Sequence, residues 1–279
     1  MSTGRVLLIE CADRKGLIHA VTGVLLRHAL NIVANDEFVD SESGRFFMRT
    51  EAEGSADTER ILEELRSLLP EGAVLRFSPA TKRSVVVLVS REYHCLGDLL
   101  LRHAHGDLNA TIEAVVGNHA VLEPLAGRFG IPFHWISHEG KSRERHEAEI
   151  LDVLRPYQPE FLVLAKYMRV LSPEFTARFP SRIVNIHHSF LPAFVGRNPY
   201  GQAAERGVKI IGATAHFVTD VLDDGPIIAQ SVIPVDHTYA ADDLSQAGRD
   251  VERSVLAKAL KLVFEDRVFL CGKRTVILS

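Results

Sequence analysis

Hydrophobic positions along residues 1–83 alternate between the period of strands and the period of helices. Strands are predicted over 5–11, 31–40, 44–53 and 73–77. A helix is predicted after the turn "ADRKG", because the residues that follow form one stripe at helical spacing: Leu17, Val21, Val24, Leu25 and His28. A second helix is predicted over 57–69 and ends before Pro70. The order βαββαβ is typical of a small ferredoxin-like α+β unit.

The pattern changes after the linker-like segment "SPATKRS" at 78–84. Continuous runs of Val, Leu and Ile now predict strands that are buried on both faces of a parallel sheet. These strands are predicted over 85–90, 110–117, 132–137, 161–166 and 182–188. Helices are predicted between them, over 95–104, 119–129, 141–154 and 172–179. A longer antiparallel pair is predicted over 208–218 and 226–235, and a final helix starts near Thr238. We therefore expect a doubly wound, mostly parallel α/β domain over 84–279, preceded by the small α+β unit with its linker over 1–83.

Composition narrows the classes of function. Of the 279 residues, 46% are apolar and 24% are charged, as in an ordinary globular protein. The formal net charge of −4 argues against nucleic acid as the main partner. No apolar run approaches the length of a membrane span, and the short one at the N-terminus predicts a strand rather than a signal peptide. Cys11, Cys95 and Cys271 are few and scattered, as reduced thiols are, so we expect a cytoplasmic protein with no membrane or nucleic-acid partner.

Candidate catalytic residues lie where the predicted strand at 182–188 ends, in "IVNIHHSFLPAF". Asn185 and His187 are two positions apart, so their side chains share one face of that strand. In a doubly wound sheet, ligands bind outside the carboxyl ends of the strands. The segment "AHFVTDVLDDGP" at 215–226 is expected at the same rim and adds a histidine and three carboxylates: His216, Asp220, Asp223 and Asp224.

An amide, an imidazole and a carboxylate are what acyl transfer without a covalent intermediate requires. The Asn185 amide can donate to the oxyanion of a tetrahedral intermediate. His187, as an imidazolium, can protonate the leaving nitrogen, and a nearby carboxylate favours that charged form. His188 is expected to pack or hydrogen-bond beside His187 rather than act as a second base. His216 fits two roles, a core histidine or a residue that orients His187 or the aspartate.

The same side chains raise the question of a metal site. A zinc hydrolase needs three converging ligands and an open fourth position. Adjacent residues of a strand point to opposite faces, so His187 and His188 are not expected to share an ion. The pairs His94-Cys95 and His103-x-His105 fail on similar geometric grounds. We therefore predict no metal.

Three stretches, "NIHHSFLPAF", "AHFVTDVLDDGP" and "LAKYMRVL", resemble the folate-dependent formyltransferase family, over essentially all of 84–279. The resemblance implies an Asn-x-His…Asp catalytic trio that falls on Asn185, His187 and Asp223. Asp223 is matched rather than Asp224, because the family's Leu-Asp-x-Gly-Pro motif falls on Leu222 to Pro226. The resemblance also implies that 166–171 and the loop 218–223 hold the pterin ring. This gives a set of substrate-binding candidates: Lys166, Tyr167, Met168, Arg169, Leu171, Val218 and Asp220.

One departure from the family pattern bears on the acceptor of the formyl group. Family members that formylate glycinamide ribonucleotide carry a Gly-rich loop after the first strand, which holds the substrate phosphate. This chain has "SREYHCLGDLL" there, with Glu92 and a single Gly97, and such a loop is a poor phosphate cradle. Water is then the expected nucleophile. The implied reaction is hydrolysis of 10-formyltetrahydrofolate to formate and tetrahydrofolate, which would feed formate to purine synthesis and requires no cofactor. The alternatives are transfer to an amine acceptor such as glycinamide ribonucleotide, and a non-catalytic sensor.

The N-terminal unit, with "DRKGL", resembles an ACT regulatory domain. Gly16 at a helix start lets backbone N–H groups approach a small carboxylate ligand. The resemblance implies an amino-acid effector near Asp13, Gly16, Leu17 and Asn35, at an interface between copies in a homo-oligomer. Methionine and glycine are the candidates from the family, and a purely oligomerising unit is the alternative.

Lys166 fits either a lysine that extends from a strand end or a residue that steers the substrate.

Overall fold

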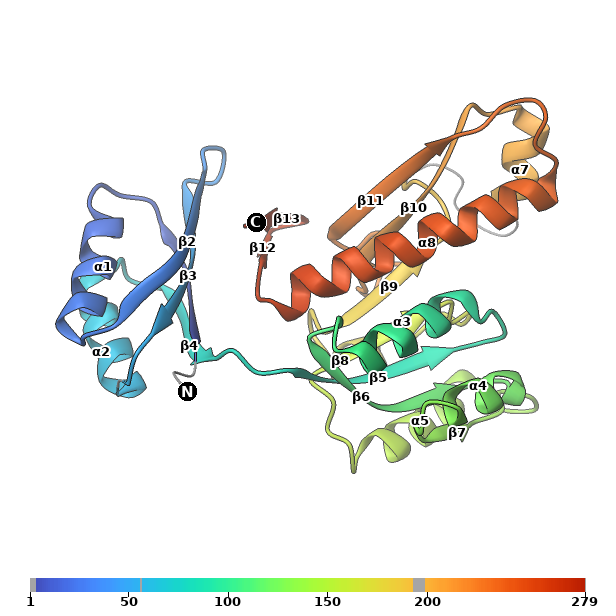
Figure 1. The fold of residues 1–279 in the computed structure, drawn as a ribbon, viewed down its shortest axis with the longest axis horizontal. Helices are drawn as coiled ribbons and strands as arrows, with labels where there is room; N and C mark the ends of the chain where they lie inside the picture. Colours follow the sequence, from blue (N-terminus) through green and yellow to red (C-terminus); the bar gives the residue numbers. More distant parts are fainter. Residues whose placement is uncertain (1–3, 56, 193–198, 279) are drawn as a thin grey trace. The chain divides into compact units, whose positions relative to one another are not determined.

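The computed structural model describes residues 4–55, 57–192 and 199–278. Contacts within the chain group these residues into two compact units (Figure 1). Unit 1 holds the residues up to Thr81 together with those from Glu265 onwards, and unit 2 spans Lys82–Phe264. The chain therefore leaves unit 1 once and comes back to it, and the two units are described separately below.

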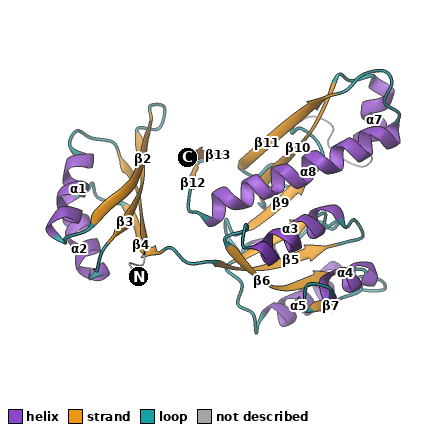
Figure 2. Cartoon of the chain, viewed as in Figure 1, coloured by secondary structure: helices purple, strands orange, loops and turns teal. Residues whose placement is uncertain are grey.

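Unit 1 has a four-stranded antiparallel sheet in the order β2-β3-β1-β4, where β1 is Arg5–Ala12, β2 Asn31–Asp40, β3 Arg45–Glu53 and β4 Val74–Pro79. Helices α1 (Leu17–Arg27) and α2 (Thr58–Leu68) lie together on one face of this sheet (Figure 2). The backbone N–H groups of Glu59 and Arg60 donate to the Asp57 carboxylate, which caps the start of α2. The predicted βαββαβ unit is confirmed.

The other face of this sheet carries a hairpin from the far end of the chain. Strands β12 (Val268–Cys271) and β13 (Arg274–Ile277) pair antiparallel. The Phe269 ring meets the fully buried Phe47 ring edge-on, with 5.5 Å between their centroids. Arg76 pairs with Asp266, and Nε of Arg49 donates to the Glu265 carbonyl oxygen at 3.0 Å. The predicted catalytic domain over 84–279 thus differs from the observed grouping in its last segment.

Unit 2 is built on a seven-stranded sheet in the order β11-β10-β9-β8-β5-β6-β7. Its strands are β5 (Arg83–Val89), β6 (Ala110–Gly117), β7 (Phe133–Trp135), β8 (Phe161–Ala165), β9 (Ile183–His187), β10 (Ile210–Phe217) and β11 (Ile227–Pro234). Neighbours from β9 to β7 run parallel, whereas β10 is antiparallel to both β9 and β11. This is the doubly wound, mostly parallel sheet that the apolar runs predict.

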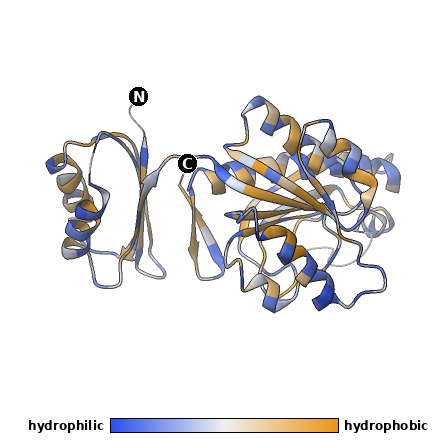
Figure 3. Ribbon diagram, turned by 90° about the horizontal axis from the view of Figure 1, so that it is seen from below, coloured by the Kyte–Doolittle hydropathy of each residue, from blue (hydrophilic) through white to orange (hydrophobic). Residues whose placement is uncertain are grey.

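Both faces of the central strands of unit 2 are covered, as their unbroken apolar runs require. Val86 and Leu88 pack with Ile150 and Leu154 of α5 (Arg143–Leu154) on one face. Helices α3 (His94–His105) and α8 (Ala241–Phe264) contact each other and other strands of the sheet. Figure 3 shows hydrophobic and hydrophilic residues together on the helices, as expected of elements with one buried side.

Two predicted helices of unit 2 need correction, and one observed helix was missed. The helix predicted over 119–129 is a 3-10 turn, η1 (Ala120–Leu122), followed by a short helix, α4 (Glu123–Gly127), and the predicted 172–179 helix is only α6 (Pro173–Thr176). Helix α7 (Pro199–Arg206) was not predicted. Across the described ranges, no helix combines the length and the apolar character that crossing a membrane would need.

The packing of Phe47 yields a prediction for stability. Phe47→Ala should lower the free energy of unfolding of unit 1 by about 3–5 kcal/mol, because it empties a closed core around Phe269 and Leu278. Phe38→Ala is the matched control, since Phe38 is the cross-strand partner of Phe47 but is 45% exposed. Urea unfolding followed by circular dichroism measures both changes, and equal losses would contradict the assignment of Phe47 to this core.

Candidate active site

The pairing of β10 with β9 brings the predicted catalytic side chains to one rim. Asn185 lies on β9 and His187 is its last residue. In the antiparallel register, His216 on β10 stands opposite Asn185, and Thr214 stands opposite His187. After Phe217 the chain leaves the sheet in a loop that carries Asp223 back over the end of β9. The amide, two imidazoles and a carboxylate therefore converge from two strands and one loop.

His187 and Asp223 make the central side-chain contact of this rim. Nδ1 of His187 lies 3.3 Å from Oδ1 of Asp223, and both side chains are largely buried. Burial acts to raise the pKa of the Asp223 carboxyl, but the hydrogen bond and charge of His187 outweigh it and lower that pKa. Nε2 of His187 is buried and has no hydrogen-bond partner among the described residues. The arrangement leaves Nε2 available to a ligand while the aspartate holds the other side of the ring.

His216 holds the amide of Asn185. Its Nδ1–H donates to the Phe217 carbonyl oxygen at 2.9 Å, which leaves Nε2 as an acceptor. The Asn185 amide nitrogen donates to that Nε2 at 3.2 Å. Burial lowers the pKa of His216, so the ring is neutral and suited to this role. Nε2 also lies 3.7 Å from Oδ1 of Asp223. The sequence left open a core histidine or a residue that orients His187 or the aspartate, whereas Nε2 of His216 is hydrogen-bonded to Asn185.

The loop that carries Asp223 depends on a glycine. A Cβ at Gly225 would overlap the carbonyl oxygen of Phe217, the same oxygen that accepts from His216. The Phe217 N–H donates to the Pro226 carbonyl oxygen at 2.9 Å and closes the loop. Asp223 has φ of 55°, in the left-handed region that non-glycine residues seldom adopt. Asp220 and Asp224 are exposed, as expected of loop carboxylates.

A pocket of about 320 Å³ opens at this rim. The segment after β8 and the loop after β10 form two of its walls, and the ends of β8, β9 and β10 complete it. The wall from 166–171 is mixed in exposure, because Lys166, Tyr167 and Leu171 are buried whereas Met168 is 58% exposed. All the substrate-binding candidates line this pocket together with the predicted trio: Lys166, Tyr167, Met168, Arg169, Leu171, Val218, Asp220, Asn185, His187 and Asp223. Their roles stay predictions.

His188 lies where the sequence argument did not place it. That argument treated His187 and His188 as strand neighbours on opposite faces. Strand β9 ends at His187, so the alternation of a strand no longer applies at His188, and both residues line the same pocket. Their centroids are 5.0 Å apart, and the ring planes are tilted by 32°. The reason given for separating these two side chains is therefore wrong. Ala193 and Phe194 of the same motif lie outside the described residues.

Sequence reasoning missed a buried polar network next to the pocket. Glu252 of α8 is fully buried. Its Oε2 accepts from Nε2 of His94 at 2.8 Å and lies 3.1 Å from Nζ of Lys166, while the Tyr200 hydroxyl donates to Oε1 at 2.6 Å. A signal was present in the sequence. Glu252 falls on the same helical stripe as Leu244, Gly248 and Leu256, where an apolar residue is expected.

Comparison with known proteins agrees with this architecture. Residues 83–260 match the family model described as formyl transferase, and residues 5–70 match that of the ACT domain. A glycinamide ribonucleotide transformylase 1 from Symbiobacterium toebii has a TM-score of 0.69 at 32% identity, over 75% of this chain and 100% of that one. The chain is therefore of the class that joins an ACT domain to a formyl transferase domain.

Full-length relatives narrow the class. A formyltetrahydrofolate deformylase from Escherichia coli (strain K12) is 57% identical over 98% of both chains. The crystal structure of a formyltetrahydrofolate deformylase from Pseudomonas syringae pv. tomato has a TM-score of 0.94 at 38% identity and covers 100% of this chain and 95% of that one. The chain belongs to the formyltetrahydrofolate deformylase family, and the expectation of an enzyme is confirmed.

The lowered pKa of Asp223 gives a prediction for pH dependence. A carboxyl whose pKa is lower in the folded chain than its usual 3.8 stabilises the fold above that pH, and the gain is lost as pH falls through the lowered value. Asp223→Asn should therefore lower the melting temperature at pH 7 relative to wild type, and the difference should shrink below about pH 4. Asp224→Asn, at an exposed neighbour, is the control. A difference that does not change with pH would contradict the ion pair.

Proposed function

We propose that the pocket in unit 2 hydrolyses 10-formyltetrahydrofolate to formate and tetrahydrofolate. One observation carries the proposal: the buried Nε2 of His187 has no partner among the described residues and lines the pocket, while Asp223 holds Nδ1 of the same ring. A histidine held in this way can donate a proton to a ligand atom. The names of the full-length relatives support the substrate and the reaction.

The reaction can be written with three residues in defined roles. The folate ring lies against 166–171 and the loop 218–223, which places the formyl group over the end of β9. The Asn185 amide donates to the formyl oxygen, and water attacks the formyl carbon and gives up one proton. Asn185 then stabilises the oxyanion of the tetrahedral intermediate. The C–N bond breaks as His187 protonates the leaving nitrogen, and Asp223 sustains the imidazolium and guides the water.

Transfer to an amine acceptor is the second candidate, and the start of α3 argues against it. A helix N-terminus can bind a phosphate when its N–H groups converge on open space. Here the carboxylate of Glu92 lies 3.6 Å from Nδ1 of His94, the first residue of α3. Negative charge at this point disfavours an acceptor phosphate. Some relatives of the catalytic domain are transformylases for glycinamide ribonucleotide, so the alternative has a direct test.

The two candidates differ in what they release without an acceptor. Purified protein given 10-formyltetrahydrofolate alone should produce formate and tetrahydrofolate in equal amounts over many turnovers. A transferase should produce neither until glycinamide ribonucleotide is added. Formate detected by a coupled dehydrogenase separates these outcomes, and formate that appears only with the acceptor would overturn hydrolysis.

Asn185 provides the test of the proposed chemistry. Asn185→Ala should lower the rate of formate release by about 10²–10³-fold, because one donor to the oxyanion is lost. Binding of tetrahydrofolate should persist, since the walls at 166–171 and 218–223 are unchanged. Asn31→Ala, on an exposed position of unit 1, is the control. Formate release at a near wild-type rate would remove Asn185 from the mechanism.

We further propose that unit 1 binds an amino acid between two copies of the chain and regulates the supply of formate for purine synthesis. Asn35 pairs with Thr50 on β3, and Thr50 pairs with Leu7 on β1, six residues before Asp13. At the rise of a strand this separates Asn35 from Asp13 by about 20 Å, so only a second copy could bring both to one ligand. Strand β2 is at the sheet edge and exposes apolar side chains that suit such a contact: Val33, Phe38 and Val39.

The effector proposal depends on the start of α1. Gly16 has φ of 89° and precedes α1 with no side-chain cap, which leaves N–H groups for a carboxylate. Methionine or glycine should change the rate of formate release by wild type, and Gly16→Ala should abolish that change. Gly44→Ala is matched, because Gly44 also has a positive φ and open space for a Cβ. A response that survives in Gly16→Ala would contradict this site.

A further inference from the structure

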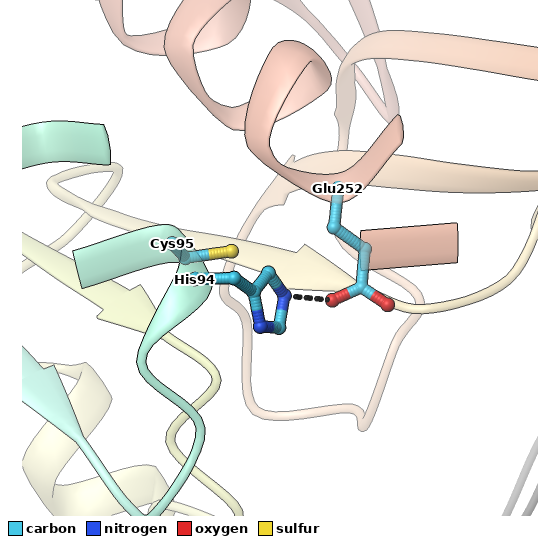
Figure 4. A group of neighbouring side chains, drawn as sticks. All are labelled: His94, Cys95 and Glu252. Carbon is cyan, nitrogen blue, oxygen red and sulfur yellow. Dashed lines mark hydrogen bonds and ion pairs between the residues drawn. The ribbon is translucent and has the colours of Figure 1, made fainter. Parts of the chain in front are cut away.

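A network of buried polar side chains converges on Glu252 from four elements of unit 2. His94 comes from α3, Lys166 from the end of β8, Tyr200 from α7 and Glu252 from α8. Figure 4 shows the His94 ring directed at the Glu252 carboxylate, with Cys95 beside it. A Cβ at Gly248 would overlap the Tyr200 ring, so this glycine lets Tyr200 approach α8. Buried charges are costly unless they are paired, and here both oxygens of Glu252 have partners.

His94, Cys95 and Glu252 place three potential metal ligands within 4.8 Å of one another. The contacts favour an ion-pair network over a metal centre. Oε2 of Glu252 already accepts from His94, and the Lys166 ammonium lies 3.1 Å from the same oxygen. A cation there would meet the positive charge of Lys166. Burial also raises the pKa of the Cys95 thiol, which disfavours the thiolate that binds metals.

The network reaches the pocket at His188. The His188 ring lies near the rings of both His187 and Tyr200, with centroid distances of 5.0 Å and 6.3 Å. It lines the same pocket as Asn185 and Asp223. Among the described residues, neither ring nitrogen of His188 has a hydrogen-bond partner. A partly buried imidazole with two unused nitrogens therefore belongs to a residue that lines the pocket with the proposed reacting groups, and two other rings lie close to it.

We propose that His188 is a second catalytic histidine, whose ring nitrogen binds the attacking water and accepts its proton as the new C–O bond forms. The inference rests on the proposed hydrolysis and names the proton acceptor for its first step. His187 already has Asp223 on Nδ1 and is assigned to protonate the leaving nitrogen. A separate neutral base lets the site hold a proton donor and a proton acceptor at once.

The proposed hydrolysis is balanced in protons and electrons. Water forms a bond to the formyl carbon and loses one proton to His188, while the carbonyl electron pair moves to the formyl oxygen. The oxygen is positively charged as this bond forms, so even a weak base takes its proton. The electron pair then returns, the C–N bond breaks, and nitrogen takes the proton of His187. Formic acid loses a proton to give formate. His187 is recharged from His188, and one proton is released to solvent.

Lys166 is the positioning residue that acts with burial to keep His188 neutral; it lines the same pocket as His188 and lies 3.1 Å from Glu252. Burial is the largest influence that lowers the pKa of His188, followed by the charges of Lys166 and His187, and together they bring it to about 4. Glu252 and Asp223 act in the opposite direction. Tyr200, whose hydroxyl donates to Glu252, is a further polar group near the ring. Lys166 has φ of 62°, in the region that favours glycine, so this position holds a lysine in spite of backbone strain.

Substitution of His188 tests the catalytic role. His188→Gln keeps a hydrogen-bonding group but no base, and formate release should fall by about 10²-fold or more while tetrahydrofolate binding is retained. The rate of formate release by His188→Ala should fall as far, and it should recover in part when imidazole is added. His105→Gln, an exposed histidine at the end of α3, is the control. If wild type releases formate and His188→Gln does so within threefold, this inference is overturned and the proposed hydrolysis stands. If wild type releases none, the proposed hydrolysis falls, and this inference with it.

A pH profile tests the role of Lys166. In Lys166→Met the pKa of His188 should rise from about 4 toward 6.5, so the acid limb of kcat should move to higher pH. The double variant Lys166→Met/Glu252→Gln removes both buried charges, so neither is left unpaired and misfolding is less of a concern. Its acid limb should move in the same direction but by less. A purely structural role would lower kcat at every pH and leave the limb in place. An acid limb that stays at its wild-type pH in both variants would overturn the positioning role.

Discussion

The antiparallel pairing of β10 with β9 is the constraint on which the site depends. Its register sets His216 opposite Asn185, so the imidazole can hold the amide, and it then releases the chain into the loop that carries Asp223. A slip of one residue would turn every side chain of β10 to the other face. The parallel strands β8, β5, β6 and β7 continue the sheet on one side of β9, and the antiparallel strand β10 brings His216 and the Asp223 loop to its other side.

Much of this arrangement could be predicted from sequence, because patterning and local order carry it. The apolar runs of β5, β6, β8 and β9 indicated a parallel sheet, and the two-residue spacing of Asn185 and His187 placed both on one face. Helix α7 escaped prediction because it is short and contains Gly201, and the four-residue strands β12 and β13 are too short for a periodic signal.

The parts that escaped prediction are long-range. The pairing of Glu252 with His94 and Lys166 joins residues far apart in the sequence, and no spacing rule brings them together. The direction of His188 depended on where β9 stops, and element ends are the least certain part of a pattern. The proposed mechanism gives different roles to two adjacent histidines. The His187 ring lies against the Asp223 carboxylate, whereas burial and the charge of Lys166 lower the pKa of His188.

The C-terminal hairpin has a consequence for how the chain can be divided. Because β12 and β13 complete the core of unit 1 around Phe47, that unit is discontinuous in sequence and is joined to unit 2 by two covalent crossings. A fragment that stopped at Thr81 would leave an aromatic face of its sheet open to water. One proteolytic cut at either crossing would leave the halves still tethered, and a gene fusion that shuffled the N-terminal module alone would carry an incomplete fold.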